Sequence, residues 1–297
     1  MITSEKDHLR VILSQFPNTS TSDIVRYDSG WDHVVYVVSN HTAFRFPRTK
    51  EYADNLPRET LLTNKLETLV PIPIPRLTLN TSPQGEVYVT YPFIPGFPLT
   101  IAENARLGKN IQVSIAHDLG RFLSSLHSVP LEDVKSLGFS QEDLTETWIR
   151  RRNTAREIVC PLVNTGTQKW IEGFYSGFVS VLKQSEITQS LIHADVESEH
   201  IIVDPKKQKL TGIIDFGDAH IGDPAYDFTF LELFESDFLH NVYETYTIPR
   251  DETFDMRRKF YLTRRIVSDL QHWIKFKDEK RVQSHVDKLQ TYANSHT

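Results

Sequence analysis

The spacing of apolar residues changes near residue 100, and this change limits the folds that are open to the chain. Before that point, Ile24–Tyr27, Val34–Val38, Thr42–Phe46 and Val87–Tyr91 are short β-rich runs separated by turn residues, which predicts a meander of strands. One helix is expected among them, over Ala53–Leu69, because leucines recur there at helical spacing. A proline-rich connector follows it, in which no helix can continue.

After residue 100 the helical period dominates. Apolar residues from Ile115 to Leu126 lie on one helix face, and further helical regions are expected from about Glu142 to Lys183 and from about Phe254 to Lys277. The remaining strand-like runs are Ser190–His193, His200–Val203 and Leu210–Asp215. The sequence therefore predicts an α+β fold. It has a β-rich N-terminal lobe over residues 1–92 and a mostly helical lobe over 93–297, which begins with a hinge at 93–100.

Composition excludes several classes of partner. The 33 basic and 39 acidic residues give a net charge of −6, so the chain lacks the basic excess of a nucleic-acid binder. No apolar run approaches the roughly 18 residues that a membrane span needs. The single cysteine, Cys160, and a start without a signal-peptide pattern favour the cytoplasm. We expect a monomer or a weak dimer that binds neither nucleic acid nor membrane.

The most informative segment is residues 190–228, in which two carboxylates bound a pair of short apolar strands. Asp195 precedes the apolar run Ile201–Val203 and Asp215 follows Gly212–Ile214, which places acidic groups at the ends of a predicted hairpin. Together with His200, these carboxylates could supply the ligands of a divalent metal and a base that orients a hydroxyl group. A single aspartate at a strand end is more often a turn former, so the prediction rests on the joint pattern.

The same segment resembles a known family. His193-x-Asp195-x-x-x-x-His200, then Ile-Asp-Phe-Gly-Asp at 214–218 and Gly-Asp-Pro-Ala-Tyr-Asp-Phe at 222–228, resemble the signature of the aminoglycoside phosphotransferase superfamily, which are small-molecule kinases with a bilobal protein-kinase-like fold. The likeness is greatest to the aminoglycoside 2''-phosphotransferases, in which histidine replaces the usual asparagine of the catalytic loop. Macrolide phosphotransferases share this replacement. Matching motifs follow in order over about residues 25 to 235.

The resemblance implies roles for the loop residues. Asp195 corresponds to the catalytic carboxylate that accepts or orients the proton of the substrate hydroxyl. Asp215 corresponds to the Mg²⁺ ligand of the Asp-Phe-Gly motif, and His200 to the second metal position, although imidazole is a softer donor than Mg²⁺ prefers. His193 is expected to brace the backbone of the loop by hydrogen bonds.

The nucleotide, ATP or GTP, is assigned to the first lobe. Ser29 and Gly30 lie between the first two strands, where backbone amides can cradle phosphate. Arg45 stands where kinases have a lysine, and Glu59 is its expected partner. Arg48 or Lys50 are the alternative sources of this positive charge. The resemblance also places nucleotide-base recognition at two backbone groups of the hinge, the Pro92 carbonyl and the Ile94 N–H, with the bulky Tyr91 beside them.

Charge indicates the acceptor. Between His193 and His240 eleven acidic residues face three lysines, a net charge of −8 that suits a small, polyhydroxylated, cationic acceptor. Asp223 and Asp227 are expected to cap and brace the chain that follows them. The acids left for the acceptor are Glu232, Glu235 and Asp237, with Trp273 and Trp148 as possible walls. Solvated helix faces would show the same acids.

Three functions stay open on the sequence alone. The first is an aminoglycoside kinase acting at the 2'' hydroxyl, which would confer antibiotic resistance. The second is a kinase of the same fold for a macrolide or another sugar or amino alcohol. The third is a non-catalytic pseudokinase or binding module, against which Asp195 and Asp215 both argue.

Overall fold

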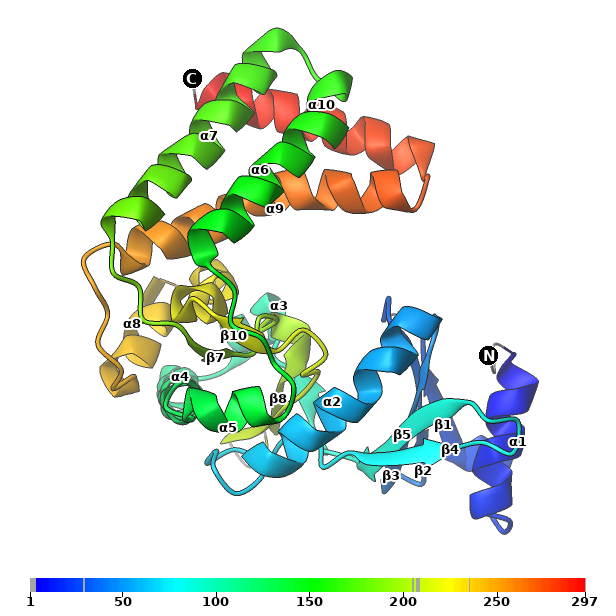
Figure 1. The fold of residues 1–297 in the computed structure, drawn as a ribbon. Coiled ribbons are helices and arrows are strands. Elements are labelled where there is room, and N and C mark those ends of the chain that lie inside the picture. The colour runs from blue at the N-terminus through cyan, green and yellow to red at the C-terminus, as the bar shows by residue number, and fades with distance from the viewer. Residues whose placement is uncertain (1–3, 29, 205, 207–208, 235, 297) are drawn as a thin grey trace. The chain divides into compact units, whose positions relative to one another are not determined.

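The structure is a computed structural model that describes residues 4–28, 30–204, 206, 209–234 and 236–296 (Figure 1). The chain forms two compact units. The sheet unit combines residues up to Phe139 with His193–His220 and Leu231–Ile248. The helical unit combines Ser140–Ile192, Ile221–Phe230 and the residues from Pro249 onward. The lobe boundary expected between residues 92 and 93 stays a prediction.

The sheet unit holds two sheets. Strands in the order β1-β2-β3-β5-β4 form a five-stranded sheet in which all pairs are antiparallel, and β6-β8-β9 form a three-stranded sheet. The elements of this unit are α1 (Glu5–Gln15), η1 (Thr21–Asp23), β1 (Ile24–Tyr27), β2 (His33–Val38), β3 (Thr42–Pro47), α2 (Lys50–Leu66), β4 (Thr78–Thr81), β5 (Val87–Pro92), β6 (Phe97–Pro98), α3 (Ile101–Arg106), α4 (Lys109–His127), α5 (Leu131–Ser136), η3 (Ser198–His200), β8 (Ile201–Asp204), β9 (Lys209–Ile213) and α8 (Ser236–Thr245).

The helical unit is built mainly on four long helices, in which α6 packs against α7 and α9, and α10 packs against α7 and α9. Two elements, β10 (His220–Gly222) and η5 (Phe230–Leu233), begin at the border between the units, and β10 pairs with β7. The other elements are α6 (Leu144–Ile158), η2 (Cys160–Leu162), α7 (Thr165–Gln184), β7 (Ser190–Ile192), η4 (Pro224–Phe228), α9 (Phe254–Lys275) and α10 (Glu279–Ser295). No helix in the described ranges is long and apolar enough to cross a membrane.

The α+β class and the first strands are confirmed, and two helix boundaries are corrected. The helix expected over Ala53–Leu69 is α2, which begins three residues earlier because the Thr49 hydroxyl caps it by accepting from the Tyr52 N–H. The helical region expected from about Glu142 to Lys183 is present as two helices, α6 and α7. It is broken at η2, where Pro161 follows Cys160 and Asn164 then caps α7.

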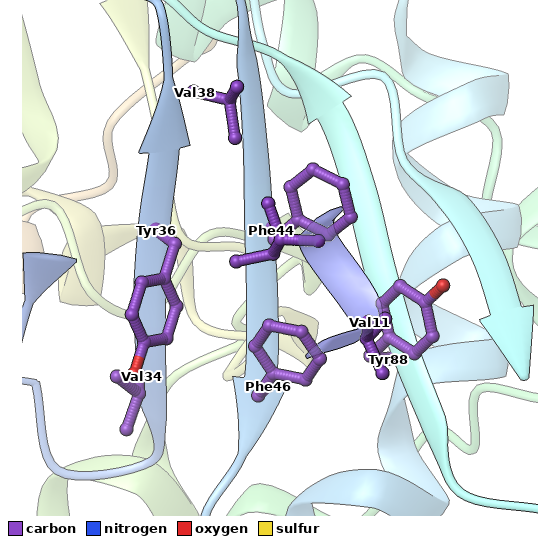
Figure 2. Packing of buried hydrophobic residues seen from close by; sticks show 8 residues of the cluster. Val11, Val34, Tyr36, Val38, Phe44, Phe46 and Tyr88 are labelled. Carbon is purple, nitrogen blue, oxygen red and sulfur yellow. The ribbon is translucent and has the colours of Figure 1, made fainter. Parts of the chain in front are cut away.

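Strand β3 separates two environments because its side chains alternate across the sheet. Phe44 and Phe46 lie on the face that α1 covers, in a cluster with Tyr36 and Tyr88 (Figure 2). The other face contacts α2. Arg45 projects on that α2 side, as the alternation predicts, which brings one cation from the middle of the sheet to the helix that carries a partner carboxylate.

Gly96 fixes the chain where it leaves the five-stranded sheet. Its φ of +145° is in a region that only glycine adopts readily. A Cβ at this position would lie 2.6 Å from the Val203 carbonyl oxygen and 2.9 Å from the Thr211 hydroxyl oxygen. The glycine therefore allows the segment after the expected hinge to contact the β8–β9 hairpin.

Candidate functional site

Two residues of left-handed backbone mark the candidate site, which lies within the sheet unit. Ala194 has a φ of +66° and Asp215 one of +68°, and neither is glycine. Non-glycine residues in this region persist where the surrounding structure holds them, often at functional sites. The fully buried His193 supplies such support, because Nε2 donates to the Ile214 carbonyl at 3.1 Å and Nδ1 accepts from the Asp195 N–H at 3.2 Å. These bonds are the bracing expected of His193.

His200 links the two carboxylates that the sequence singled out. Its Nδ1 lies 2.9 Å from the Asp195 carbonyl oxygen and 3.2 Å from the Asp195 carboxylate, and its Nε2 lies 3.8 Å from the Asp215 carboxylate. Burial lowers the pKa of His200, but the hydrogen bond and charge of Asp195 and the charge of Asp215 outweigh it and raise the pKa to about 9. The ring is therefore an imidazolium near neutral pH.

The ion pair expected between Arg45 and Glu59 is present, with both side chains buried. Arg45 Nη1 also lies 3.5 Å from Asp215 Oδ1. Burial lowers the pKa of Arg45, but the charges of Glu59 and Asp215 outweigh it and raise the pKa above its usual value. Burial would raise the pKa of Asp215, yet Arg45 and His200 lower it, so this carboxylate stays ionised.

The two alternative sources of positive charge are engaged elsewhere. Arg48 Nη2 lies 2.5 Å from the Asp28 carboxylate, and Lys50 Nζ lies 2.6 Å from Asp54. Neither contact includes a residue of the candidate site. Of the three cations considered from the sequence, Arg45 is the one that contacts both Glu59 and Asp215.

Two carboxylates that the sequence did not assign belong to this site. Burial, followed by the charges of Asp195 and Asp215, raises the pKa of Asp218 to about 6. Burial also raises the pKa of Asp32, against a hydrogen bond from Tyr52. The charges of Asp195 and Asp215 therefore act on two further carboxylates, one of which, Asp32, belongs to the first turn. Asp32 has no sequence signal of its own, because it acts on the others only after the chain folds.

Gly30 lies in the turn between β1 and β2. Its carbonyl oxygen accepts a hydrogen bond of 3.0 Å from Arg48 Nε, and Arg48 also donates to the Asp28 carbonyl at 3.0 Å. Arg48 thus organises the turn that holds Gly30. Ser29, the other residue expected to cradle phosphate, lies outside the described residues.

The hinge groups lie at the end of the β3–β5 ladder. Pro92 stands opposite Thr42, and the Phe93 N–H donates to the His41 carbonyl at 2.8 Å. The Ile94 N–H has no hydrogen-bond partner among the described residues. Burial raises the pKa of Tyr91 to about 12 against the charge of Arg45, which places the tyrosine beside the buried ion pair.

The acids and rings expected at the acceptor are distributed over both units. Glu232 and Asp237 are exposed residues of the sheet unit, whereas Glu235 lies outside the described residues. Trp273 belongs to the helical unit, where the Arg281 guanidinium lies 4.1 Å from its ring centroid. Trp148 is 4% exposed, so the interpretation of its ring as an open wall is wrong, and it is a core residue of the helical unit.

The Gly-Asp-Pro segment contributes an internal clamp in the helical unit. Asp223 accepts from the Ala225 N–H at 3.0 Å, which is the capping expected of it. Its carboxylate also accepts from Arg257 Nε at 2.6 Å and from the Tyr261 hydroxyl at 2.6 Å. Asp251 binds the far side of the same guanidinium at 2.7 Å. Arg257 therefore joins the start of η4 to α9.

The described residues contain no group of three or more His, Cys, Asp or Glu side chains arranged to hold a metal ion. Mg²⁺ is commonly bound by one or two carboxylates together with substrate phosphates and water, so a site of this kind needs fewer protein ligands. The Asp215 carboxylate suits it, because its oxygens are hard donors, its pKa is lowered and 41% of the side chain is exposed. His200 fits less well, because Nδ1 contacts Asp195 and the proton on Nε2 would have to leave.

This arrangement, the partly exposed and ionised carboxylate of Asp215 beside the buried Arg45–Glu59 ion pair, is typical of enzymes that transfer phosphoryl groups. The chain belongs to the phosphotransferase enzyme family, whose model matches residues 23–258.

Three relatives illustrate the likeness. Viomycin phosphotransferase of Streptomyces vinaceus is 22% identical over 236 residues, which cover 76% of this chain and 77% of that protein. The structure of an APH(2'') enzyme with GDP and kanamycin has a TM-score of 0.88 at 24% identity and covers 99% of this chain and 100% of that one. Macrolide 2'-phosphotransferase MphH from Brachybacterium faecium gives 0.74 at 15% identity, covering 96% and 98%. The kinase-like fold is thereby confirmed.

Proposed function

We propose that the protein is a kinase that transfers the γ-phosphate of ATP or GTP to the 2'' hydroxyl of an aminoglycoside, with Mg²⁺. The observation that carries this proposal is the arrangement of Asp195, His200, Asp215 and Arg45 in consecutive contacts within the sheet unit. Family membership supports phosphoryl transfer, and the acceptor is inferred from two relatives, one named for viomycin and one with kanamycin bound.

Asp195 is assigned the role of catalytic carboxylate. It orients the acceptor hydroxyl and accepts its proton as the bond to phosphorus forms. His200 fixes the direction of this carboxylate, since its Nδ1 lies 3.2 Å from an Asp195 carboxylate oxygen. A positioned general base of this kind contributes about 10²–10⁴-fold to a rate.

Mg²⁺ would be held by Asp215 and, after loss of the Nε2 proton, by His200. When bound, the ion neutralises charge on the phosphate oxygens of the nucleotide. Arg45 works beside it as a fixed cation, because Glu59 holds its guanidinium in place and keeps it charged. The buried pair with Glu59 therefore holds the positive charge of Arg45 in one position, which an exposed and flexible side chain would not do.

The nucleotide is assigned to the first 92 residues and the hinge. The amides around Ser29 and Gly30 would receive phosphate, and the Pro92 carbonyl and the Ile94 N–H would recognise the base. The absence of a partner for Ile94 N–H among the described residues supports the second assignment. Tyr91 would border the same pocket.

The remaining residues, 93–297, are assigned to catalysis and acceptor binding. Glu232, Glu235, Asp237 and Trp273 are the proposed acceptor contacts. Carboxylates suit the amino groups of an aminoglycoside, and Asp218, whose pKa the charge of Asp195 raises, adds to the negative potential. A macrolide has little positive charge to match them, which makes it the second candidate for acceptor.

A coupled assay of nucleotide consumption with Mg²⁺ tests the proposal. We expect turnover with kanamycin and gentamicin, with ATP and GTP compared as donors, and none with erythromycin-class macrolides, sugars or simple amino alcohols. Turnover of another alcohol with silence on every aminoglycoside would reject the acceptor and keep the kinase. No consumption above that of the Asp195→Asn variant with any acceptor would reject the kinase and favour a binding module.

A further inference from the structure

Two arginines meet at one tryptophan in the helical unit. The Arg151 guanidinium carbon, from α6, lies 4.8 Å from the Trp148 ring centroid, and that of Arg264, from α9, lies 5.3 Å from it. The tryptophan is buried, and four further rings enclose it, which belong to Tyr175, Phe178, Phe260 and Tyr261. Two positive charges therefore lie near one buried aromatic ring.

These two arginines differ from the others of the same helices. Within α6 and α9, whose residues are all described, every other arginine has a carboxylate partner. The pairs are Arg150–Glu142, Arg152–Glu172, Arg156–Glu172, Arg257–Asp223, Arg258–Asp255 and Arg265–Asp269. In the described part of the chain, no carboxylate forms an ion pair with Arg151 or Arg264.

Placing these charges together has an electrostatic cost. The guanidinium of Arg151 lies against the Trp148 ring, and partial desolvation of this otherwise exposed side chain, followed by the charge of Arg264, lowers the pKa of Arg151. Like charges that are near enough to shift each other's pKa repel, and an anion bound between them would offset this repulsion. Stacking on Trp148 would need only one arginine, so packing alone does not account for the second.

Arg264 has one N–H donor, at Nε, that is not used within the described residues. Its Nη2 contacts the Tyr226 hydroxyl, and its guanidinium carbon lies 5.3 Å from the Tyr226 ring centroid. Its Nε is buried and has no acceptor among the described residues. A buried donor without an acceptor is unfavourable, so the surrounding side chains do not fully satisfy this guanidinium. Arg151 is exposed to solvent, which gives a ligand access to the pair.

We propose that Arg151, Arg264 and the Tyr226 hydroxyl form a binding site for the oxyanion of a small molecule, a carboxylate or a phosphate. Arginine suits this ligand because its planar fork of N–H groups matches two oxygens at once. The aromatic floor of Trp148 fixes the direction of the fork. The amino groups of a cationic acceptor would be repelled here, so this site is distinct from the proposed acceptor contacts and does not depend on the proposed kinase activity.

Titration of the full chain with inorganic phosphate and with acetate, at constant ionic strength kept by chloride, tests the site. The readout is the indole N–H resonance of Trp148, assigned from its loss in Trp148→Phe. We expect a saturable shift with at least one of the two anions, together with a rise in Tm of about 2–4 °C at saturation. Phosphate alone, or acetate alone, would identify which oxyanion the site takes. Both outcomes support the proposal.

Four variants localise the effect. Arg151→Gln and Arg264→Gln should each weaken the anion at least about tenfold, since each removes a charge-assisted contact. Arg150→Gln is the matched control, because it is the neighbouring arginine on α6 and already pairs with Glu142. Arg151→Lys, at the exposed position, keeps the charge without the fork and should bind with intermediate affinity while the fold is preserved.

The proposal is overturned by a Trp148 resonance that neither anion shifts beyond the effect of chloride. It is also overturned by equal affinities in the wild type, Arg151→Gln and Arg264→Gln. Phosphate binding near Arg45 would produce that second result, which keeps the nucleotide site from being mistaken for this one.

Discussion

Arg45 Nη1 lies 3.5 Å from Asp215 Oδ1, so one guanidinium contacts two carboxylates, because Nη2 of the same side chain pairs with Glu59. The contact connects the interior of the five-stranded sheet to the loop that follows β9. Arg45 and Glu59 are buried, whereas 41% of the Asp215 side chain is exposed. The ion pair therefore forms a fixed base on which the exposed carboxylate is positioned.

Replacing the guanidinium of Arg45 by the ammonium of a lysine should weaken nucleotide binding. In Arg45→Lys the ammonium keeps a contact with Glu59 but loses the planar fork, so we expect the Kd for ATP with Mg²⁺ to rise about tenfold, equivalent to ~1.4 kcal/mol. Calorimetric titration measures it. Lys50→Gln is the control, since that lysine is 79% exposed and pairs with Asp54. An unchanged Kd in Arg45→Lys, with a weaker one in Arg48→Gln, would transfer the phosphate contact to Arg48.

Removing the cation altogether should affect stability first. Arg45→Ala leaves the buried Glu59 carboxylate without its partner, which costs about 3–5 kcal/mol in comparable buried pairs. The double variant Arg45→Ala/Glu59→Gln should recover part of this loss, because no unpaired charge then remains. Urea unfolding curves compare the two. Equal midpoints for the single variant and the wild type would contradict the pairing.

Asp195→Asn should separate catalysis from binding. We expect phosphoryl transfer to fall by roughly 10²-fold or more, because a positioned base is lost, while nucleotide affinity is kept. The pKa of His200 should also fall from about 9, since the charge and hydrogen bond of Asp195 raise it. NMR titration of the ring measures this. Glu199→Gln, an exposed neighbour, is the control, and near-wild-type transfer in Asp195→Asn rejects the assigned role.

Much of the sheet and of the catalytic loop could be predicted from the sequence because the signals there are local. Alternation alone places Phe44 and Phe46 on one face of β3 and Arg45 on the other. The break between α6 and α7 also has a local signal, Pro161, but the apolar spacing on both sides hides it. The expected hairpin is present, since β8 and β9 follow each other in the chain and pair antiparallel.

The residues that sequence reasoning missed depend on contacts between distant segments. Asp32 and Asp218 are ordinary turn aspartates in the sequence, and their pKa values rise only because folding partly desolvates them and brings other carboxylates near. Arg151 and Arg264 are separated by more than a hundred residues, and each stands in a run of arginines. No pattern distinguishes them from neighbours that form ion pairs until the carboxylates are placed.

The Arg257 clamp predicts how the helical unit responds to acid. Hydrogen bonds from Arg257 and Thr253, against partial burial, hold the pKa of Asp251 well below its usual range. A lowered carboxylate pKa contributes stability that is present above about pH 4, the unfolded value, and is lost as pH falls through the folded one. We expect wild-type stability to decline below pH 4, and Asp251→Asn to reduce that decline. Circular dichroism across the urea transition at several pH values measures both slopes, and parallel slopes would contradict the prediction.

His33 predicts a second pH dependence, at milder acidity. Burial, followed by the charge of Arg45, lowers the pKa of His33 to about 3, so the ring is neutral in the fold. In the unfolded chain the ring titrates near pH 6.5, so below that pH the unfolded chain binds a proton that the folded protein does not. Between about pH 3 and 6.5 stability should therefore fall as pH falls, by at most about 1.4 kcal/mol per pH unit for this group. His33→Gln cannot titrate, so its unfolding midpoint should vary less between pH 6.5 and 4.5 than that of the wild type. Above pH 7 the two midpoints should keep a constant difference, whereas an equal dependence at pH 4.5–6.5 would show that His33 takes up a proton in the folded protein.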